Sequence, residues 1–466
     1  MAIFSAILIL VMLVQLFYVR GESLIFLSCC VLCSLIFSIS LSFNNNSRFY
    51  HPYVFILLAT FIGVTLRGFY MVYEADNPLI NSFFLLNQNI SYFSVPTLML
   101  LSGLLIFTIA YHFTKGALGL KNLKTFKYDY VWNQRRVNIL TIVYSLISLA
   151  GIILFIQVMG ISSIASDISA KRFAQTDENA MASTSYGYFR LMANFIQPLL
   201  YIFLVNFIVE KKKIISFHGL VLFLIGLANL FFPVFTSSRS DLLTIFLNVF
   251  IVLSLLGRFN VRLVVTVMPI AMLLFTVMTL LRPSKSNEID TQNINLLEPF
   301  IYNKNLLDVS KTAHVINGVP SKMEYQYGAS YMALIYAPIP RQWWPDKPVL
   351  GTSKDIAHKI YGYSEKNQAG IPPGMAGEAY VNFAYPGILL FFLLSGILLR
   401  KTYNAFDFEK GALNKNRVVL YVTVVVYITI ILFGSSVNQA VLAVAQNYIP
   451  LWIALRFISD FKKINT

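Results

Sequence analysis

Arginine side chains next to apolar runs are the residues of this sequence best suited to chemistry. Arg239 stands in the short turn FTSSRSDLL, at the start of an apolar run. A guanidinium stays charged and offers a planar fork of donors that matches phosphate oxygens. A helix beginning at this turn would add its positive end, so we expect Arg239 to bind an anion such as a phosphate group. Four further arginines are candidates for the same role: Arg67, Arg190, Arg282 and Arg341.

A loop rich in proline and tryptophan is the second candidate. It reads PIPRQWWPDKPVLG over residues 338–351, and its prolines exclude a helix and fix its shape. Arg341 and Lys347 suit phosphate, while the indole faces of Trp343 and Trp344 suit sugar rings. We therefore expect a site that holds a phosphate and a sugar together. The alternative is an aromatic anchor at a membrane surface with flanking charge.

Glu378 is the candidate for acid–base chemistry. It lies in GIPPGMAGEAYVNFAYPG, a mostly uncharged stretch that leads into an apolar run. A carboxylate in such surroundings can act as a general base. The alternative is a salt bridge to one of the arginines, and the two roles are compatible. Tyr380 and Asn382 are expected to bond to sugar hydroxyls.

Metal and nucleotide chemistry have weaker support in the sequence. His314 and His358 are weaker candidates for the base, because an isolated loop histidine is usually just solvated. Glu74 and Asp76 form only a weak pair of metal ligands. There is no glycine-rich nucleotide loop, which argues against an ATP-driven or nucleotide-sugar enzyme. We expect no metal and no cofactor.

These residues have to be positioned by membrane helices. The chain has 466 residues, of which 57% are hydrophobic and only 12% are charged. Apolar runs of about 17–25 residues recur, each long enough to cross a bilayer, and in lipid they must be helical. The first run is expected to be a retained span, and Cys29, Cys30 and Cys33 to be buried thiols in the second. About twelve spans are expected, near residues 2–19, 24–43, 53–73, 95–113, 138–159, 189–209, 214–235, 241–257, 262–281, 386–402, 417–434 and 439–458.

The distribution of lysine and arginine predicts the orientation. With the N-terminus in the cytoplasm, most of the basic residues in short connections fall on the cytoplasmic side, so both termini are expected there. This explains the net charge of +15 without nucleic acid as a partner. The chain then divides into residues 1–281 with nine spans, an outer loop of residues 282–385 with short helices, and residues 386–466 with three spans. Within the loop, Tyr325–Ile339 is expected to form a helix at the membrane surface.

Together these features resemble an oligosaccharide repeat-unit polymerase of the Wzy type, the O-antigen polymerase family of bacterial envelopes. The resemblance covers the architecture of the whole chain. It also rests on three local patterns, Ser-Ser-Arg239-Ser, Pro340-Arg341 followed by Pro345-Asp-Lys347-Pro348, and Gly377-Glu378-x-Tyr380-x-Asn382-Phe383. The family often has glycine after the Asn-Phe pair, where this chain has Ala384.

The resemblance implies a GT-C-like helical fold and a metal-independent glycosyltransferase in the bacterial inner membrane. A hydroxyl of one lipid-linked repeat unit would attack the anomeric carbon of the growing glycan, and undecaprenyl diphosphate would leave. Cations lower this barrier by neutralising the leaving group. In this reaction, the diphosphate would be bound by Arg239, Arg341 and Lys347, with Arg67 and Arg282 in support. Glu378 would act as the base or orient the acceptor, with His314 or His358 as the fallback. The sugars would lie along Trp343, Trp344 and Tyr380.

The implied partners are undecaprenyl-diphosphate-linked oligosaccharides, membrane lipids and, as a further partner, a chain-length regulator protein. Two other functions stay open. A lipid-linked oligosaccharide flippase or other transporter fits twelve spans, but rocking-bundle transporters usually have short loops and midplane charge. An O-antigen ligase uses the same donor with a lipid A core acceptor, and composition does not separate it from a polymerase.

Overall fold

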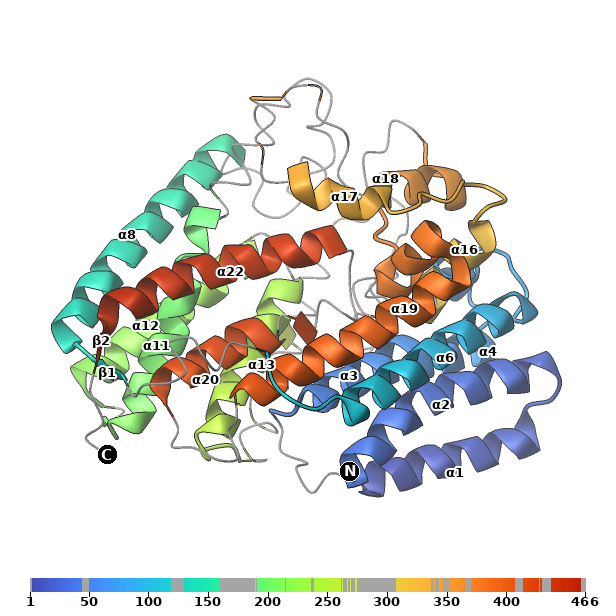
Figure 1. Cartoon of the computed structure of the whole chain (residues 1–466), viewed down its shortest axis with the longest axis horizontal. Coiled ribbons are helices and arrows are strands. Elements are labelled where there is room, and N and C mark those ends of the chain that lie inside the picture. The colour runs from blue at the N-terminus through green and yellow to red at the C-terminus, as the bar shows by residue number, and fades with distance from the viewer. Residues whose placement is uncertain are drawn as a thin grey trace.

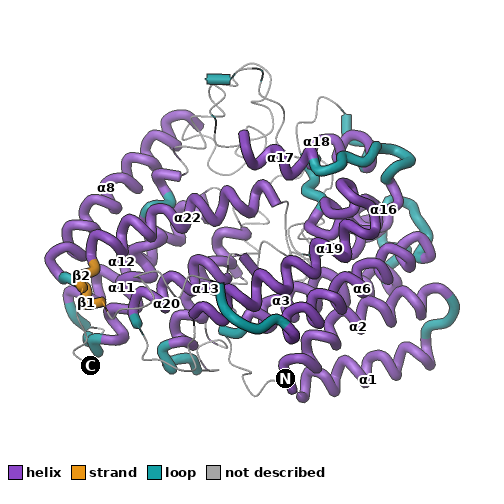
Figure 2. Tube along the Cα trace, in the orientation of Figure 1, coloured by secondary structure: helices purple, strands orange, loops and turns teal. Residues whose placement is uncertain are grey.

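The structure is a computed structural model, and the regular elements of its described part are helices and one pair of short strands. It describes residues 2–43, 50–118, 130–159, 189, 191–213, 215–235, 239–260, 262, 266, 269, 273–274, 307–336, 339, 343–344, 346, 352–364, 370–406, 414–426, 428–429 and 437–461. Figures 1 and 2 show the helices packed against one another as a bundle, with the strands at one edge. The expected all-α class is confirmed.

The first half of the chain contributes ten helical segments and a strand to the described structure. They are α1 (Ala2–Tyr18), α2 (Glu22–Phe43), α3 (Pro52–Thr60), the π-helical turn η1 (Phe61–Leu66), α4 (Arg67–Tyr73), α5 (Pro78–Ile80), η2 (Asn81–Leu85), α6 (Ser91–Phe113), β1 (Tyr130–Trp132), α8 (Gln134–Met159) and α11 (Ile196–Val209). Because α3, η1 and α4 follow without a break, they form one apolar helical segment, Pro52–Tyr73.

The second half adds the helices that carry most of the candidate site. They are α12 (Phe217–Phe235), α13 (Arg239–Leu255), α16 (Val309–Gly318), α17 (Ala329–Tyr336), α18 (Ser353–Asp355), η5 (Ile356–Ile360), α19 (Gly374–Phe406), α20 (Lys415–Tyr421), η6 (Val422–Val426) and α22 (Val437–Ile458), followed by the strand β2 (Ser459–Phe461). The stretch Tyr325–Ile339 contains the helix α17, and its expected place at the membrane surface stays a prediction.

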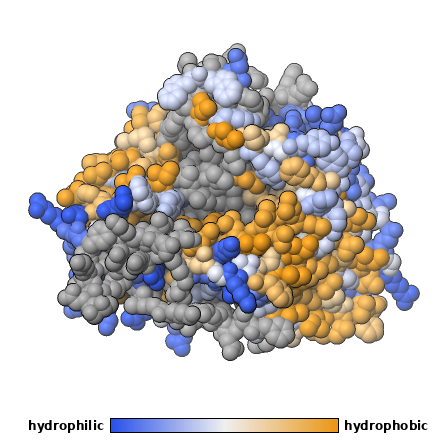
Figure 3. Space-filling model, in the orientation of Figure 1, coloured by the Kyte–Doolittle hydropathy of each residue, from blue (hydrophilic) through white to orange (hydrophobic). Residues whose placement is uncertain are grey.

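Seven helical segments of the described structure are long and apolar enough to cross a membrane. They are Glu22–Ser42, Pro52–Tyr73, Ser91–Phe113, Gln134–Gln157, Leu191–Val209, Phe217–Val234 and Gly374–Phe406. Large apolar side chains stand exposed along α1, α8 and α12. Figure 3 shows apolar surface over α1 and α2, next to more hydrophilic surface where α16 and α18 lie. A soluble protein rarely exposes so much continuous apolar surface, so these helices indicate a polytopic membrane protein.

Several of the expected spans are not among these seven segments. The expected first span is the shorter apolar helix Ser5–Tyr18, and the eighth contains Asp241–Leu255. The expected spans 262–281 and 417–434 lie largely or partly outside the described residues. Cys29, Cys30 and Cys33 are free and buried in α2, as expected.

Contacts between distant segments define two ends of the bundle. At one end β1 pairs antiparallel with β2, and the Leu118 backbone N–H donates to the Lys401 carbonyl. The start of α1 belongs to this end too, through contacts that run from Ser5 to α2 and from α2 to His112. We call it the basic end, after Lys115, Arg136, Lys211, Lys401, Lys415 and Arg456. The opposite loop end holds α16, α17 and α18 (Figure 1).

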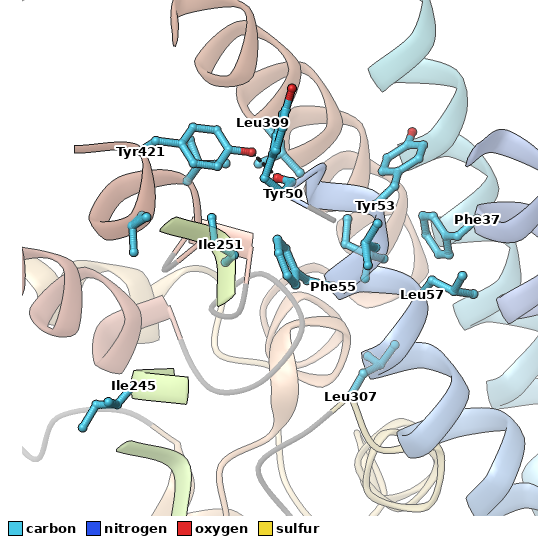
Figure 4. Close-up of a cluster of buried hydrophobic side chains, with 14 of the residues drawn as sticks. Phe37, Tyr50, Tyr53, Phe55, Leu57, Ile245, Ile251, Leu307, Leu399 and Tyr421 are labelled. Carbon is cyan, nitrogen blue, oxygen red and sulfur yellow. Dashed lines mark hydrogen bonds between the residues drawn. The ribbon is translucent and has the colours of Figure 1, made fainter. Parts of the chain in front are cut away.

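An aromatic and apolar core runs between the two ends. Figure 4 shows Phe37, Tyr53 and Leu57 gathered from α2 and α3, and Tyr421 of α20 reaching the backbone at Tyr50. The Phe37 and Tyr53 rings meet edge to face with their centroids 5.4 Å apart. Burial of such rings fixes α3 against its neighbours.

Close packing of α6 against α19 sets the position of the longest helix. A Cβ atom at Gly396 would lie only 2.5 Å from the Phe107 carbonyl oxygen, and one at Gly103 only 2.5 Å from the Phe392 ring. Small residues that let two backbones approach are typical of membrane helix interfaces. The helix α19 runs from the loop end to the basic end. Its packing against α6 therefore fixes the position of the polar residues near both ends of α19.

Candidate functional site

The short helix α16 brings polar side chains into the interior of the loop end. Its N-cap Asp308 accepts hydrogen bonds from the backbone N–H groups of Ser310 and Lys311, at 3.0 and 3.1 Å. Such a cap satisfies donors that a helix start otherwise leaves free. Lys311 and His314 are buried, and the helix packs against α6 and α19. The expected outer loop therefore contains a segment that is inserted against membrane helices.

A buried ion pair joins α16 to the third apolar segment. Arg67 Nη1 lies 2.9 Å from Asp308 Oδ2, and both side chains are almost fully buried. The Arg67 guanidinium also lies over the Phe84 ring, with its carbon 4.9 Å from the ring centroid. An arginine within an apolar segment needs a partner because its charge is costly there. Asp308 supplies that partner for the predicted site residue Arg67.

Asp308 is held as a carboxylate despite its burial. Burial alone would raise the pKa of Asp308, but Arg67, Lys311 and the hydrogen bonds from Lys311 and Ser310 together lower it below its usual value. Two cations thus interact with one carboxylate at the start of α16. Lys311 also approaches α19, since a Cβ atom at Gly374 would lie 3.9 Å from the Lys311 ammonium.

His314, a candidate base, is buried in the same helix as Lys311. Its Nε2 lies 2.7 Å from the Phe84 carbonyl oxygen, which can only accept, so Nε2–H donates. Its ring packs against those of Tyr92, Phe93 and Tyr361. The other candidate histidine, His358, lies partly buried in η5 with Nδ1 3.0 Å from the Tyr363 carbonyl oxygen.

Glu378 lies fully buried in the first part of α19. Its Oε2 accepts a hydrogen bond of 2.7 Å from the backbone N–H of Val437, the first residue of α22. A carboxylate is favoured at a helix N-terminus because free N–H groups and the helix dipole point at it. Oε1 has no hydrogen-bond partner among the described residues, and no described lysine or arginine forms a salt bridge with Glu378. The Val437 N–H therefore positions one carboxylate oxygen, and the Ser330 side chain lies close to the same carboxylate.

Asn382 ties the start of α17 to the helix of Glu378. Its amide nitrogen donates to the Glu378 carbonyl and to the Ser330 hydroxyl, each at 2.8 Å. Its Oδ1 accepts from the Gly328 backbone N–H at 2.9 Å. Both amide protons are thus engaged by protein groups, so Asn382 orients α17 next to Glu378.

The α19 helix is kinked just beyond Asn382. Ala384 has φ 54° and ψ −151°, a region that favours glycine, and Pro386 follows without an N–H to donate. Glycine is the residue that the resemblance leads one to expect at this position. The sequence places the start of the tenth span at residue 386, whereas the helix begins at Gly374. Glu378, Tyr380 and Asn382 consequently sit on a helical segment that is angled away from the span.

Ala384→Gly is expected to stabilise the protein by about 1 kcal/mol, because it removes backbone strain of ~1–3 kcal/mol while loosening the unfolded chain. The measurement is thermal unfolding of the detergent-purified protein. Ala405→Gly, in the regular part of α19, is the matched control and is expected to destabilise by about 1 kcal/mol. Equal losses in both variants would contradict the strain at Ala384.

The remaining predicted residues are only partly placed. Trp343 is exposed, and the Trp344 ring lies 6.0 Å from that of Tyr336. The half-buried Tyr380 ring lies 6.1 Å from that of Tyr325. Arg239 begins α13, as the turn predicts, but its side chain lies outside the described residues. Arg190, Arg282, Arg341 and Lys347 lie outside them as well, so their expected convergence stays a prediction.

Three groups that organise this region were not among the predicted site residues. They are Asp308, Lys311 and the N-terminus of α22. Asp308 followed by Val-Ser-Lys is an N-cap pattern that predicts a helix start. The local sequence does not indicate that α16 is buried, because its polar residues are equally typical of a helix in water.

Sequence and fold comparisons do not assign the chain to a known group. A scan against protein-family models found no match, and searches of curated proteins and of solved structures found no significant match.

Proposed function

We propose that the chain is a membrane glycosyltransferase that polymerises lipid-linked oligosaccharide repeat units. The observation that supports it best is a buried carboxylate and a buried ammonium near the start of α19. Oε2 of Glu378 is held by the Val437 N–H, and Lys311 lies beside Gly374, one helical turn earlier in α19. A carboxylate and an ammonium near one end of the same helix suit a reaction in which a hydroxyl is deprotonated and an anionic group leaves.

In the proposed reaction, the oxygen of an acceptor sugar hydroxyl bonds to the anomeric carbon of the growing glycan. The bond from that carbon to the diphosphate oxygen breaks, and its electron pair goes to undecaprenyl diphosphate. The hydroxyl proton passes to Oε1 of Glu378. Lys311 joins the predicted cations Arg239, Arg341, Lys347, Arg67 and Arg282 as a group that neutralises the leaving diphosphate.

We also propose the orientation and setting of this reaction. The basic end faces the cytoplasm of a bacterium, because basic connections are retained on that side. The loop end then faces outward, where lipid-linked glycans would meet, and the full chain has about twelve spans in a GT-C-like arrangement. The exposed Trp343 and the neighbouring Trp344 and Tyr380 would guide the sugars.

Deletion of the gene in its bacterial host tests the function. We expect the ladder of envelope glycans on a gel to disappear, leaving a single repeat unit attached to its acceptor. Restoration by the wild-type gene is the control. A complete loss of attached units would instead indicate a ligase or a flippase, and an unchanged ladder would contradict all three functions.

A further inference from the structure

A second polar cluster lies at the basic end, at the opposite end of α19 from Glu378. The Arg400 guanidinium carbon lies 5.1 Å from the centroid of the Tyr111 ring. The His51 ring centroid lies 6.1 Å from that of Tyr111 and 5.0 Å from that of Tyr403. His112 follows Tyr111 at the end of α6, and its ring centroid is 5.8 Å from that of Tyr111. We call these five residues the Arg400 cluster.

The cluster has a cation but no carboxylate. Among the described residues, no aspartate or glutamate forms a salt bridge with Arg400, and its buried Nε has no hydrogen-bond partner. Burial, Arg400 and His112 lower the pKa of His51, which precedes the span Pro52–Tyr73, to about 3, so the ring is neutral near pH 7. A half-buried cation at a membrane helix without a counterion is costly, and an anion would remove that cost.

The donors of the cluster fit a phosphoryl group. The guanidinium has a fork of N–H donors, and stacking over Tyr111 fixes its plane. His51 Nδ1 accepts from the Tyr53 backbone N–H at 3.3 Å, so its proton lies on Nε2, which can donate. His112 is exposed and hydrogen-bonds through Nε2 with the Ser40 hydroxyl, so the cluster reaches the protein surface.

We propose that the Arg400 cluster binds a phosphoryl group at the basic end of the bundle. Its place at the end of an apolar helix, where lipid headgroups lie, points to an anionic phospholipid such as phosphatidylglycerol as the source. Free phosphate carries the same chemistry and is separated from the lipid by experiment. This inference does not depend on the proposed glycosyl transfer, because it concerns the opposite end of α19.

The test measures ligand-induced thermal stabilisation of the full-length protein in detergent. Phosphatidylglycerol is expected to stabilise the wild-type protein more strongly than phosphatidylcholine at the same concentration. Arg400→Gln is expected to weaken phosphatidylglycerol binding about tenfold or more, because it removes charge-assisted hydrogen bonds. Arg456→Gln is the matched control, since Arg456 also stacks on an aromatic ring, 5.0 Å from the Trp452 centroid, but is exposed. This control is expected to bind as the wild type does.

A second arm titrates inorganic phosphate against chloride at equal ionic strength. Stabilisation by inorganic phosphate that Arg400→Gln removes, without preference for phosphatidylglycerol, identifies free phosphate as the source. If Arg400→Gln does not yield folded protein, Arg400→Lys keeps the charge without the planar fork and is expected to weaken binding several-fold. Wild-type affinity in both Arg400 variants, or equal effects of both lipids with none from phosphate, overturns the proposal.

Discussion

Asp308→Asn is expected to lower the free energy of unfolding by about 3–5 kcal/mol, because it leaves the Arg67 guanidinium buried without its carboxylate. The measurement is thermal or denaturant unfolding of the purified protein. Asp460→Asn is the matched control. It breaks the exposed Arg136–Asp460 pair, whose atoms lie 2.7 Å apart, and is expected to cost below about 1 kcal/mol.

The same ion pair gives stability a defined dependence on pH. The pKa of Asp308 is lower in the folded protein than its ordinary value of 3.8. Its contribution is therefore complete above that ordinary value and is lost as the pH falls through the lower, folded value. Asp308→Asn should flatten the acid limb of a stability curve, whereas Asp460→Asn should leave it in place. Equal costs of the two substitutions at neutral pH would contradict the assigned burial of the pair.

Replacing both Arg67 and Asp308 tests whether the stability depends on the ion pair itself or on the other contacts of Asp308. The double variant Arg67→Met with Asp308→Leu removes the two charges together and fills the space with apolar groups. It is expected to recover part of the stability that Asp308→Asn loses, because the Arg67 charge is removed together with its carboxylate while the buried Lys311 still loses that carboxylate. A double variant as unstable as the single one would show that hydrogen bonds from Asp308 to α16 matter more than the pair.

Glu378→Gln is expected to reduce polymerisation by about 10²–10⁴-fold while the protein still folds. Glutamine keeps an oxygen that can accept the Val437 N–H, but it cannot take up a proton. The measurement is chain extension of lipid-linked repeat units by the purified variant, normalised to folded protein. Glu74→Gln, which alters an exposed carboxylate beyond α4, is the control and should retain activity.

The opposite pattern would limit Glu378 to a structural role. If Glu378→Gln lowers stability but leaves turnover per folded molecule unchanged, the carboxylate serves only to cap α22. Asn382→Ala distinguishes the two further, since it should loosen α17 and lower activity without touching the carboxylate itself.

Helices that can be recognised from their apolar composition alone were well predicted from the sequence. The runs near residues 24–43, 53–73, 95–113 and 138–159 appear as long apolar helices, because burial in lipid depends on composition that the sequence states directly. Arg239 at the start of α13 was predicted for a similar reason, since the turn that precedes it is local.

What depends on distant partners was not predicted. The polar helix α16 is buried because Arg67, far earlier in the chain, meets its N-cap. The first part of α19 is tied to distant segments as well, through Asn382 to Gly328 and through Glu378 to the Val437 N–H. Composition indicates that residues 370–385 lie between loop and membrane, but it does not reveal the distant partners that the helix from Gly374 meets.

The pairing of β1 with β2 has a consequence for how the protein is made. Asn133, beside β1, bonds to Asp460 in β2, 327 residues later. A ribosome therefore delivers α8 to the bilayer long before the strand that anchors it exists. Until residue 461 has been synthesised, α8 is held by lipid and by its contacts with α11, so ribosome stalling within the last helices would leave an otherwise finished bundle open at this end.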